Sequence, residues 1–450
     1  MKRLSIFQII LLVSFGSLAV AGVLVFALAV GGGQTNTVGS ITIWGTLDKA
    51  AFSAVLRSAS QEVQELKQVT YEQKDPTTYE SELTNALASG TGPDLFLMRQ
   101  DYALKNSGKV YPVLFSVFSQ TNFESTFIES AKTFLIQDGF VAVPLLADPL
   151  VFYVNKDLLA SGGFAEPPKY WDELFNISKK LTKKDDSGSI IQSTIALGEY
   201  QNVPYAKNIL ATLILQAGGS VTRRDVGGNL ISTLTPKEGE NSQAAISALR
   251  FFTEFADPSK DYYSWNRSLP DAQKAFSAGD LAFYIGYASE SSFISRTNSN
   301  LNYVVAPLPQ IRPTPNTSGT VLSTARVYGL AASRTGKNPG GAITVAFILA
   351  DKVNSNSLSF ALGLSPARTD VLKALEQKST RAASLLPDTI CKGQDVALCS
   401  TIFARFWLDP DPEKTDQIFR GMIQNTTSGA LQVREAIQRA DQEFGQLLKQ

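Results

Sequence analysis

The sequence predicts an α/β protein with two lobes, and three observations support this. Residues 40–44, 69–73 and 93–98 have the composition of strands, and the helical segments between them are spaced as in a parallel sheet with crossover helices. A chain of 450 residues is too long for one ordinary core. Residues 143–174 combine a buried-strand pattern with proline- and glycine-rich turns, and we place the junction of the two lobes there.

The composition is that of a folded globular protein, with 44% hydrophobic and 18% charged residues. Lys plus Arg and Asp plus Glu both number 41, so the net charge is zero, which argues against a nucleic-acid-binding surface. The chain has no histidine, which excludes Ser-His triads, His-ligated zinc and the usual general base near neutral pH. We predict no enzyme activity, no cofactor and no metal site.

The chain has two cysteines, Cys391 and Cys399, eight residues apart. This arrangement is typical of a small loop closed by a disulfide in an oxidising compartment. Two unpaired thiols are the alternative, and two sulfurs without a histidine make a poor zinc site.

The N-terminal 33 residues are expected to form a membrane anchor. Lys2 and Arg3 precede an uncharged apolar run from about residue 5 to residue 30, long enough to cross a bilayer. The basic residues place the N-terminus inside the cell and the rest of the chain outside. Residues 34–40 then form a flexible tether. The alternative is a signal peptide cleaved near Ala27–Ala29.

The elements are expected in the following order. Asp48 is the predicted N-cap of a helix whose apolar face runs from Phe52 to Leu66, and a second helix ends at Gly90. In the junction, Pro144, Asp148 and Pro149 are read as turn residues that precede a strand at 150–154. Further strands are expected at 281–285 and 327–332 and an extended segment at 303–309. Helices are expected at 209–216, 244–256, 271–278, 341–352, 358–362, 415–424 and 430–449.

These segments resemble a known family. From about residue 41 to the C-terminus the chain is similar to the extracellular solute-binding proteins of ABC importers, family 1, in the sugar-binding group that includes maltose-binding protein. The likeness is carried by ITIWGTLDK (41–49), GTGPDLFLM (90–98), PLLADPLVFYVNKDLL (144–159), PPKYWDEL (167–174), AFSAGDLAFYIG (275–286), APLP (306–309), GLSPAR (363–368) and the C-terminal FWLDP and ALQVREAIQRADQEF segments. The strand-NKD-PP-x-W-x-E-L combination is the most specific of these.

The resemblance implies the periplasmic-binding-protein (Venus-flytrap) fold, with a ligand cleft that closes by a hinge motion. Lobe 1 would comprise residues 41–147 and 306–363, and lobe 2 residues 148–305 and 364–450. The chain would cross between them near 145–149, 304–309 and 363–366.

A sugar presents hydroxyl groups, which need carboxylates, amides or arginine, and ring faces, which pack on aromatic side chains. The resemblance and this chemistry suggest ten ligand-binding residues: Trp44, Asp48, Lys49, Asp101, Asp148, Glu199, Tyr200, Tyr287, Arg326 and Trp407. Each has a structural alternative, such as a helix cap for Asp48, a hinge hydrogen bond for Asp148 and a core anchor for Trp407. Trp171 is assigned to packing, and the role of Trp265 is left open.

The predicted function is therefore the substrate-binding subunit of an ABC importer. It would capture an extracellular solute, most plausibly a carbohydrate, and deliver it to permease subunits driven by a cytoplasmic ATPase. The protein is expected to be a monomer attached to the membrane by its N-terminal helix. The alternatives are a binder of polyamines, anions or peptides, a glycoside hydrolase using carboxylates such as Asp148 and Glu199, or a sensory protein.

Overall fold

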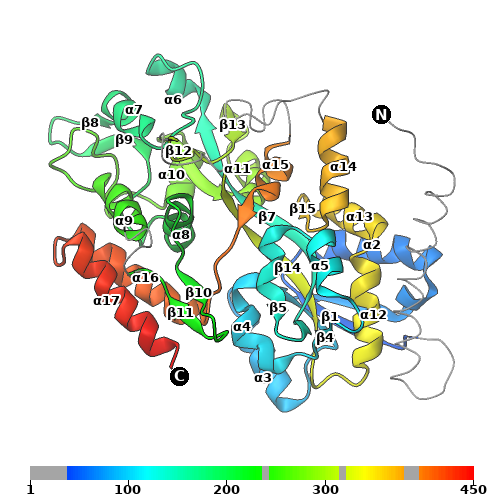
Figure 1. Ribbon diagram of the computed structural model, residues 1–450. Coiled ribbons are helices and arrows are strands. Elements are labelled where there is room, and N and C mark those ends of the chain that lie inside the picture. Colours follow the sequence, from blue (N-terminus) through cyan, green and yellow to red (C-terminus); the bar gives the residue numbers. More distant parts are fainter. Residues whose placement is uncertain (1–37, 236–242, 314–320, 380–394, 450) are drawn as a thin grey trace, which may run out of the picture. The chain divides into compact units, whose positions relative to one another are not determined.

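The computed structural model describes residues 38–235, 243–313, 321–379 and 395–449, which form two compact α/β units (Figure 1). Unit 1 comprises residues 1–146 and 327–371, and unit 2 comprises residues 147–326 and 372–450. The chain passes from one unit to the other three times, which is the connectivity that the two-lobe prediction requires.

Unit 1 contains the parallel sheet that the strand-helix-strand pattern predicts. β1 (Ile41–Gly45) lies between β2 (Val69–Gln73) and β3 (Leu95–Arg99) and pairs in parallel with both. β14 (Ser323–Ala332) runs antiparallel beside β3. Because β1, β2 and β3 are parallel, their carboxyl ends meet at one edge of the sheet, where open α/β sheets bind ligands.

The first helix of unit 1 begins where the sequence predicts, whereas α12 and α13 begin two and six residues before the predicted starts at 341 and 358. Asp48 caps α2 (Lys49–Glu62), because its Oδ1 accepts a hydrogen bond from the Ala51 N–H at 2.8 Å. The predicted apolar face of α2 is buried, and α2 packs beside α13 (Lys352–Leu362) (Figure 1). The other elements of this unit are α3 (Tyr79–Ser89), α4 (Ala103–Asn106), β4 (Val113–Leu114), α5 (Gln120–Thr126), β5 (Leu135–Ile136), β6 (Gly139–Phe140), α12 (Pro339–Leu349), β15 (Ser365–Pro366) and the start of α14 (Thr369–Ser379).

β7 (Val143–Asn155) is a single strand in which every residue is buried. The sequence analysis was wrong to begin this strand at Leu150, since the predicted turn residues Pro144, Asp148 and Pro149 lie within it. In unit 2, β7 pairs antiparallel with β12 (Leu281–Tyr287) from Leu150 onward and with β13 (Tyr303–Ala306) from Phe152 onward. Both ladders begin after Pro149, so neither needs the N–H that a proline lacks.

Unit 2 places helices around the sheet that contains β7, β12, β9 (Ile190–Ile195) and β8 (Lys183–Lys184). α8 (Ala206–Gln216) packs on α9 (Ala244–Glu254), and α16 (Pro412–Thr427) packs on α17 (Val433–Leu447). The remaining elements are α6 (Lys156–Ser161), α7 (Glu173–Leu181), β10 (Thr222–Arg224), β11 (Leu230–Ser232), α10 (Ala272–Ala278), α11 (Ser291–Thr297), α15 (Val396–Ile402) and β16 (Ala404–Arg405).

Two tryptophans belong to the core of unit 2. Trp171 is buried, as predicted, and its ring packs edge-on against Phe152 and Phe251. Trp265, whose role the sequence left open, is 1% exposed and donates a hydrogen bond from Nε1 to Asn202 Oδ1 at 3.1 Å. Buried indole N–H groups usually find such a partner.

Two of the three unit boundaries fall later in the chain than predicted, and the first falls one residue earlier, after residue 146. Residues 306–326 lie in unit 2 rather than in lobe 1, and residues 364–371 lie in unit 1 rather than in lobe 2. Backbone hydrogen bonds explain why both segments lie in these units. Gln310 O accepts a hydrogen bond from the Trp171 N–H at 3.1 Å in unit 2, and the Ala367 N–H donates to Leu145 O at 3.1 Å in unit 1.

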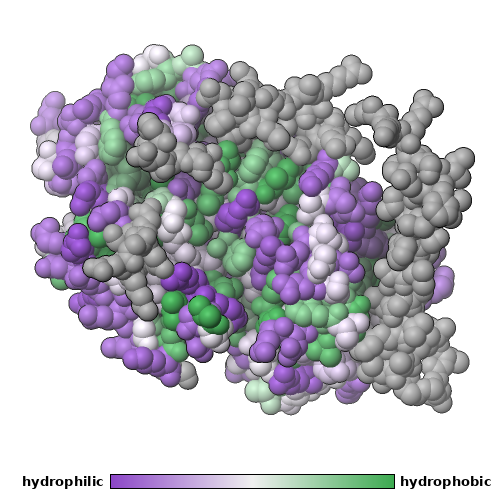
Figure 2. Space-filling model, in the orientation of Figure 1, coloured by the Kyte–Doolittle hydropathy of each residue, from purple (hydrophilic) through white to green (hydrophobic). Residues whose placement is uncertain are grey.

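The outer helix α17 is amphipathic. α17 buries Ala436, Ile437, Ala440 and Phe444, and Figure 2 shows mainly hydrophilic residues around α16 and α17. Across the described residues, no helix combines the length and apolarity needed to cross a bilayer. The predicted anchor, residues 1–33, lies outside the described residues.

Gly139 in unit 1 is a position where a side chain should not fit. A Cβ atom built on it would lie 2.2 Å from the carbonyl oxygen of Val113 on the paired strand β4. We expect Gly139→Ala to lower the free energy of unfolding by about 2–3 kcal/mol, because overpacking displaces backbone. Gly108→Ala is the control, since no atom lies within 4 Å of a Cβ there. Equal stability of the two variants in urea denaturation would contradict this account.

Candidate functional site

Trp44 and Lys74 lie at the carboxyl ends of β1 and β2 in unit 1. The Trp44 ring is half-buried, and the Lys74 ammonium lies 3.7 Å from the ring centroid. Lys74 also forms a 3.2 Å ion pair with Glu72. A cation over an aromatic face is a favourable contact. The sequence analysis did not identify Lys74, because only the pairing of β1 with β2 brings it onto Trp44.

The predicted pair Asp48 and Lys49 is exposed at the same edge of the sheet. Asp48 serves as the α2 N-cap, and the Lys49 N–H donates to Gln73 Oε1 at 2.9 Å. Asp48 therefore has the helix-cap role that was considered for it. The cap still allows Asp48 to contact a ligand, since a carboxylate has more acceptor positions than the cap uses.

Asp101 follows β3 and is half-buried. The Arg99 Nε donates to Asp101 Oδ1 at 3.0 Å, and Arg99 Nη2 donates to Oδ2, so the two side chains form a bidentate pair. The Arg99 guanidinium also lies 5.0 Å from the centroid of the Tyr102 ring. Any ligand hydroxyl at Asp101 would therefore meet a carboxylate whose orientation is already fixed.

Asp148 is the centre of a polar cluster in unit 2. Its side chain is 1% exposed, and both its oxygens are hydrogen-bonded. The Ser289 N–H donates to Oδ1 at 3.0 Å, and the Ser289 hydroxyl donates to Oδ2 at 2.6 Å. Ser289 follows β12, and the pairing of β12 with β7 brings the two residues together. The sequence analysis selected Asp148 but not Ser289.

The ionisation of Asp148 is perturbed. Burial raises its pKa to about 6, although the Ser289 hydrogen bonds and the Arg326 charge act in the opposite direction and Glu290 reinforces the rise. Removal of a carboxylate from water disfavours its charged form. Asp148 therefore changes its charge between mildly acidic and neutral pH.

The charge of Arg326 acts on this carboxylate, and Arg326 in turn lies over the rings of Tyr287 and Tyr205. The Arg326 guanidinium lies 4.0 Å from the Tyr287 ring centroid and 5.7 Å from that of Tyr205. The two rings meet edge-to-face at 4.7 Å. Tyr287 is 3% exposed, whereas Arg326 and Tyr205 are half-buried. The structure thus brings together three predicted residues, Asp148, Tyr287 and Arg326.

Glu290 holds the backbone at the end of β12, where Tyr287 lies. Its carboxylate accepts hydrogen bonds from the Tyr287 N–H at 2.8 Å and from the Tyr284 hydroxyl at 2.6 Å. The Tyr153 hydroxyl donates to Tyr287 O at 2.7 Å. Burial and the Glu290 charge raise the pKa of Tyr284, so that phenol stays neutral and acts as a donor. These bonds preorganise the end of β12.

Tyr205 is a further candidate residue that the sequence analysis did not select. Among the described residues it is the one non-glycine residue with a positive φ, 61°. This conformation is uncommon for a bulky side chain, and such strain is concentrated at functional positions. The sequence shows Pro204-Tyr205 before a helix, but nothing in that pattern indicates a left-handed backbone.

Glu199 and Tyr200 have structural partners elsewhere in unit 2. Glu199 is buried, and the Arg267 Nε donates to it at 3.3 Å. The Tyr200 hydroxyl donates to Asp416 Oδ1 on α16, and Arg420 covers its ring at 5.2 Å. Burial and Asp416 raise the pKa of the Tyr200 hydroxyl. The described contacts of these two residues do not include the Asp148 cluster.

Trp407 lies in the segment between β16 and α16 and is half-buried. Its ring packs against Phe419 at 6.0 Å and Phe444 at 6.3 Å, which is the anchoring role considered for it. Contact between Trp407 and a ligand stays a prediction.

The predicted disulfide joins Cys391 and Cys399. Cys391 lies outside the described residues, so the disulfide stays a prediction. Cys399 itself is buried in α15.

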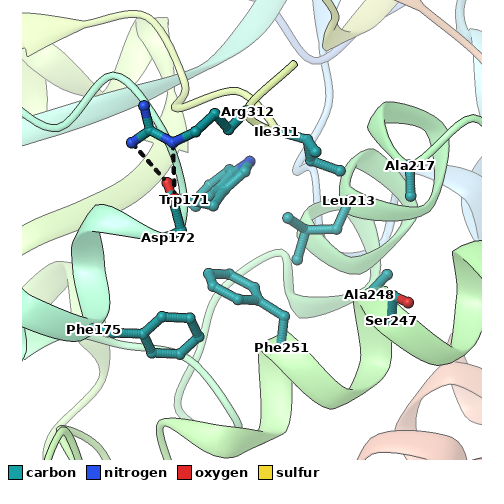
Figure 3. Close-up of a pocket in the computed structure, with 10 residues that line it drawn as sticks. All are labelled: Trp171, Asp172, Phe175, Leu213, Ala217, Ser247, Ala248, Phe251, Ile311 and Arg312. Carbon is teal, nitrogen blue, oxygen red and sulfur yellow. Dashed lines mark hydrogen bonds and ion pairs between the residues drawn. The ribbon is translucent and has the colours of Figure 1, made fainter. Parts of the chain in front are cut away.

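A separate hollow of about 260 Å³ lies in unit 2 between α7, α8 and α9 (Figure 3). Its walls are apolar, and the aromatic rings of Trp171, Phe175 and Phe251 face it. At its rim Arg312 is bound to Asp172 at 2.9 Å. The Trp171 indole N–H is already bound to Gln216 at 2.6 Å. The hollow therefore offers little to the hydroxyl groups of a sugar.

The Asp148 cluster offers the groups that bind a polar molecule. It supplies a carboxylate acceptor, a guanidinium donor and aromatic surface, which are the groups that hold a polar ring compound. The two carboxylates named in the hydrolase alternative have other partners, Ser289 for Asp148 and Arg267 for Glu199.

Solved structures with the same fold include three whose chains are covered almost completely. The GacH receptor of Streptomyces glaucescens, solved unliganded and with acarbose, is 18% identical over 91% of this chain and 98% of its own, with a TM-score of 0.67. An ABC transporter solute-binding protein of Thermotoga lettingae, bound to α-D-tagatose, is 20% identical over 91% and 99%, with a TM-score of 0.65. The cyclic α-maltosyl-1,6-maltose-binding protein of Arthrobacter globiformis is 16% identical over 91% and 99%, with a TM-score of 0.70.

These similarities confirm the two-lobe periplasmic-binding-protein fold. At the level of sequence, residues 53–353 match the family model described as bacterial extracellular solute-binding protein. That match covers well over half of the chain and concerns binding proteins rather than enzymes, which confirms the predicted family and removes the hydrolase alternative. The chain therefore belongs to the family of bacterial extracellular solute-binding proteins.

Proposed function

We propose that this protein captures a carbohydrate outside the cytoplasm as the substrate-binding component of an ABC importer. The observation that carries the proposal is the Asp148 cluster, in which a preorganised carboxylate interacts with Arg326 and Arg326 lies over the ring of Tyr205. A carboxylate and a guanidinium bind sugar hydroxyls, and an aromatic ring packs against the CH face of a sugar. Sugar-bound structures with the same fold support this ligand class.

Unit 1 carries predicted ligand-binding residues of its own. Trp44 lies near the carboxyl end of β1, Asp48 and Lys49 follow β1, and Asp101 follows β3. They offer one aromatic ring, two carboxylates and an ammonium. The prediction that binding is accompanied by a hinge motion rests on the family, since a ligand favours one conformation only if it binds that conformation more tightly.

The extracellular family fits the predicted delivery of solute to a membrane permease. We further propose that the apolar run at residues 5–30 anchors the protein in the membrane. We also propose that the protein is a monomer. Recovery of the intact N-terminus from the membrane fraction, with Met1 or Lys2 identified by mass spectrometry, would support the anchor. A mature N-terminus near residue 30 in the medium would instead indicate cleavage.

Calorimetric titration of the full-length chain tests the ligand class. The panel comprises maltose, maltotriose, maltotetraose, acarbose and tagatose, with spermidine and a dipeptide as representatives of the alternatives. Saturable binding of a saccharide that is recovered unchanged supports the proposal. Binding of spermidine or the dipeptide alone would overturn the carbohydrate assignment.

Tyr205→Gly is expected to weaken saccharide binding by roughly tenfold, which is the loss typical of removing one aromatic contact at a binding hot spot. Glycine adopts a φ of 61° without strain, so the fold should be retained. The matched control is Phe251→Ala, which removes an aromatic ring from the apolar hollow instead. If both variants bind with wild-type affinity, Tyr205 is not part of the site.

A further inference from the structure

Lys207 is a buried cation that the proposed site does not use directly. It is the second residue of α8 and is 8% exposed. Its Nζ donates to Asp409 Oδ2 at 2.6 Å, to Thr415 Oγ1 at 2.6 Å and to Pro412 O at 3.2 Å. An ammonium group has three donors, so all of them are satisfied.

Neither burial nor the local helix favours a lysine at this position. The first turn of a helix carries a partial positive charge, which repels a cation. A buried ammonium is costly unless it is paired and hydrogen-bonded. What stabilises Lys207 is therefore the segment around Asp409, which lies about two hundred residues later in the chain. Such a pair is more plausibly explained by the geometry it fixes than by net stability.

The segment that Lys207 holds carries Trp407. Residues 406–409 have neither helical nor strand structure, so few backbone bonds fix them. The Lys207 ammonium lies 5.4 Å from the centroid of the Trp407 ring. Asp409, two residues after Trp407, is 4% exposed, and its Oδ1 also accepts from the Asp411 N–H at 3.2 Å and from Thr415 Oγ1 at 2.8 Å.

Lys207 also lies close to Tyr205 in the sequence. One residue, Ala206, separates the strained Tyr205 from Lys207 at the start of α8. The ammonium therefore joins two stretches of unit 2 that each present a half-buried aromatic ring, Tyr205 and Trp407. A displacement of either stretch would change how far apart these rings stand.

We propose that Lys207 is a positioning residue for the ligand, because its ammonium ties the segment that carries Trp407 to the start of α8 and so fixes the Trp407 ring. This inference rests on the proposed function in one respect, namely that Trp407 contacts the saccharide. Lys207 itself touches no ligand. Its effect on affinity should therefore pass through Trp407.

The test uses the paired variant Lys207→Met with Asp409→Asn in the full-length chain. It removes both charges at once, so no unpaired buried charge is left to unfold the protein. With maltotriose and maltotetraose as probes, we expect affinity to fall by about tenfold, as for loss of an interface hot spot. The control is Lys179→Met, which removes an exposed lysine paired with Asp261 at 2.8 Å and should bind as the wild type.

A double-mutant cycle separates positioning from general damage. Trp407→Ala alone should weaken binding, and adding the paired variant to Trp407→Ala should cause no further loss, because contacting groups couple. Losses that multiply would overturn the inference, since Lys207 would then act independently of Trp407. So would wild-type affinity of the paired variant while Trp407→Ala binds weakly, and in that outcome the proposed function still stands.

A second readout needs no ligand. Acrylamide quenching of Trp407 fluorescence, taken as the difference between each protein and its Trp407→Phe counterpart, should at least double in the paired variant. If no saccharide binds to the wild type, the proposed function fails and this measurement alone decides the positioning role. Unchanged quenching would overturn that role.

Discussion

Asp148→Asn is expected to weaken saccharide binding at pH 7.5 by roughly 10- to 100-fold, since hydrogen bonds to a charged group contribute about 1.5–3 kcal/mol. Both Asp148 oxygens already accept from Ser289, at 3.0 and 2.6 Å, but each retains a second acceptor position for a ligand hydroxyl. An asparagine keeps the shape and one acceptor oxygen while removing the charge. Titration calorimetry with maltotriose measures the change.

The same substitution should abolish a pH dependence of binding. Burial raises the pKa of Asp148 to about 6, so the carboxylate is mostly protonated at pH 5 and mostly ionised at pH 7.5. If only the ionised form binds the ligand, affinity at pH 5 should be about tenfold weaker than at pH 7.5, because a protonated Asp148 must lose one proton before it binds. Arg326→Gln should shift the midpoint to higher pH, because the Arg326 charge lowers this pKa.

The contribution of Asp148 to folding stability should depend on pH in the opposite sense to ligand affinity, falling as the pH rises. The folded-state pKa of Asp148 lies above its ordinary value of 3.8, so its contribution to stability is fully present below pH 3.8 and is lost as the pH rises through about 6. At pH 7.5 the asparagine variant should therefore melt no lower than the wild type. Asp172→Asn, which alters an exposed carboxylate bound to Arg312, is the control for affinity. Binding that is independent of pH in the wild type would contradict the role of Asp148.

Trp265→Ala is expected to lower the free energy of unfolding by about 3–5 kcal/mol, the range for truncating a large aromatic side chain in a core. The ring is 1% exposed, and its removal leaves a cavity and also leaves Asn202 Oδ1 without the indole donor. Urea denaturation followed by circular dichroism measures the loss. Trp265→Phe, which fills most of the space, should cost less.

Saccharide affinity distinguishes this structural role from a role in binding. Trp265→Ala protein that is still folded at low temperature should bind maltotriose as the wild type does. A large loss of affinity with unchanged stability would place Trp265 in the site instead of the core.

The amino-acid pattern was sufficient for the fold of unit 1. The strands predicted at 40–44, 69–73 and 93–98 and the cap at Asp48 depend on local periodicity and on side-chain hydrogen bonds to the neighbouring backbone, which are visible in the sequence. β7 was misjudged for the same reason, since proline is read locally as a turn residue. Whether a strand tolerates Pro149 depends on which of its N–H groups a neighbouring strand needs, and the ladders with β12 and β13 begin beyond it.

The candidate site could be predicted only in part. Asp148, Tyr287 and Arg326 were selected one by one from chemistry and resemblance, and the structure gathers them. Tyr205, Ser289 and Lys74 were missed, because each becomes a site residue only through a partner far away in the chain. Glu199 and Tyr200 were selected, yet their partners Arg267 and Asp416 are supplied by other elements of unit 2.

By itself the sequence determined the α/β class, the two-lobe organisation and the family of this protein, because hydrophobic periodicity, turn residues and family motifs are properties of short segments. Only the tertiary structure decided that Asp148 is buried against Ser289, that Arg326 lies over Tyr287, and that Lys207 holds the segment of Trp407. The physical reason is that desolvation and pairing depend on atoms brought together by strand register and helix packing, and these long-range contacts leave no mark on local patterns.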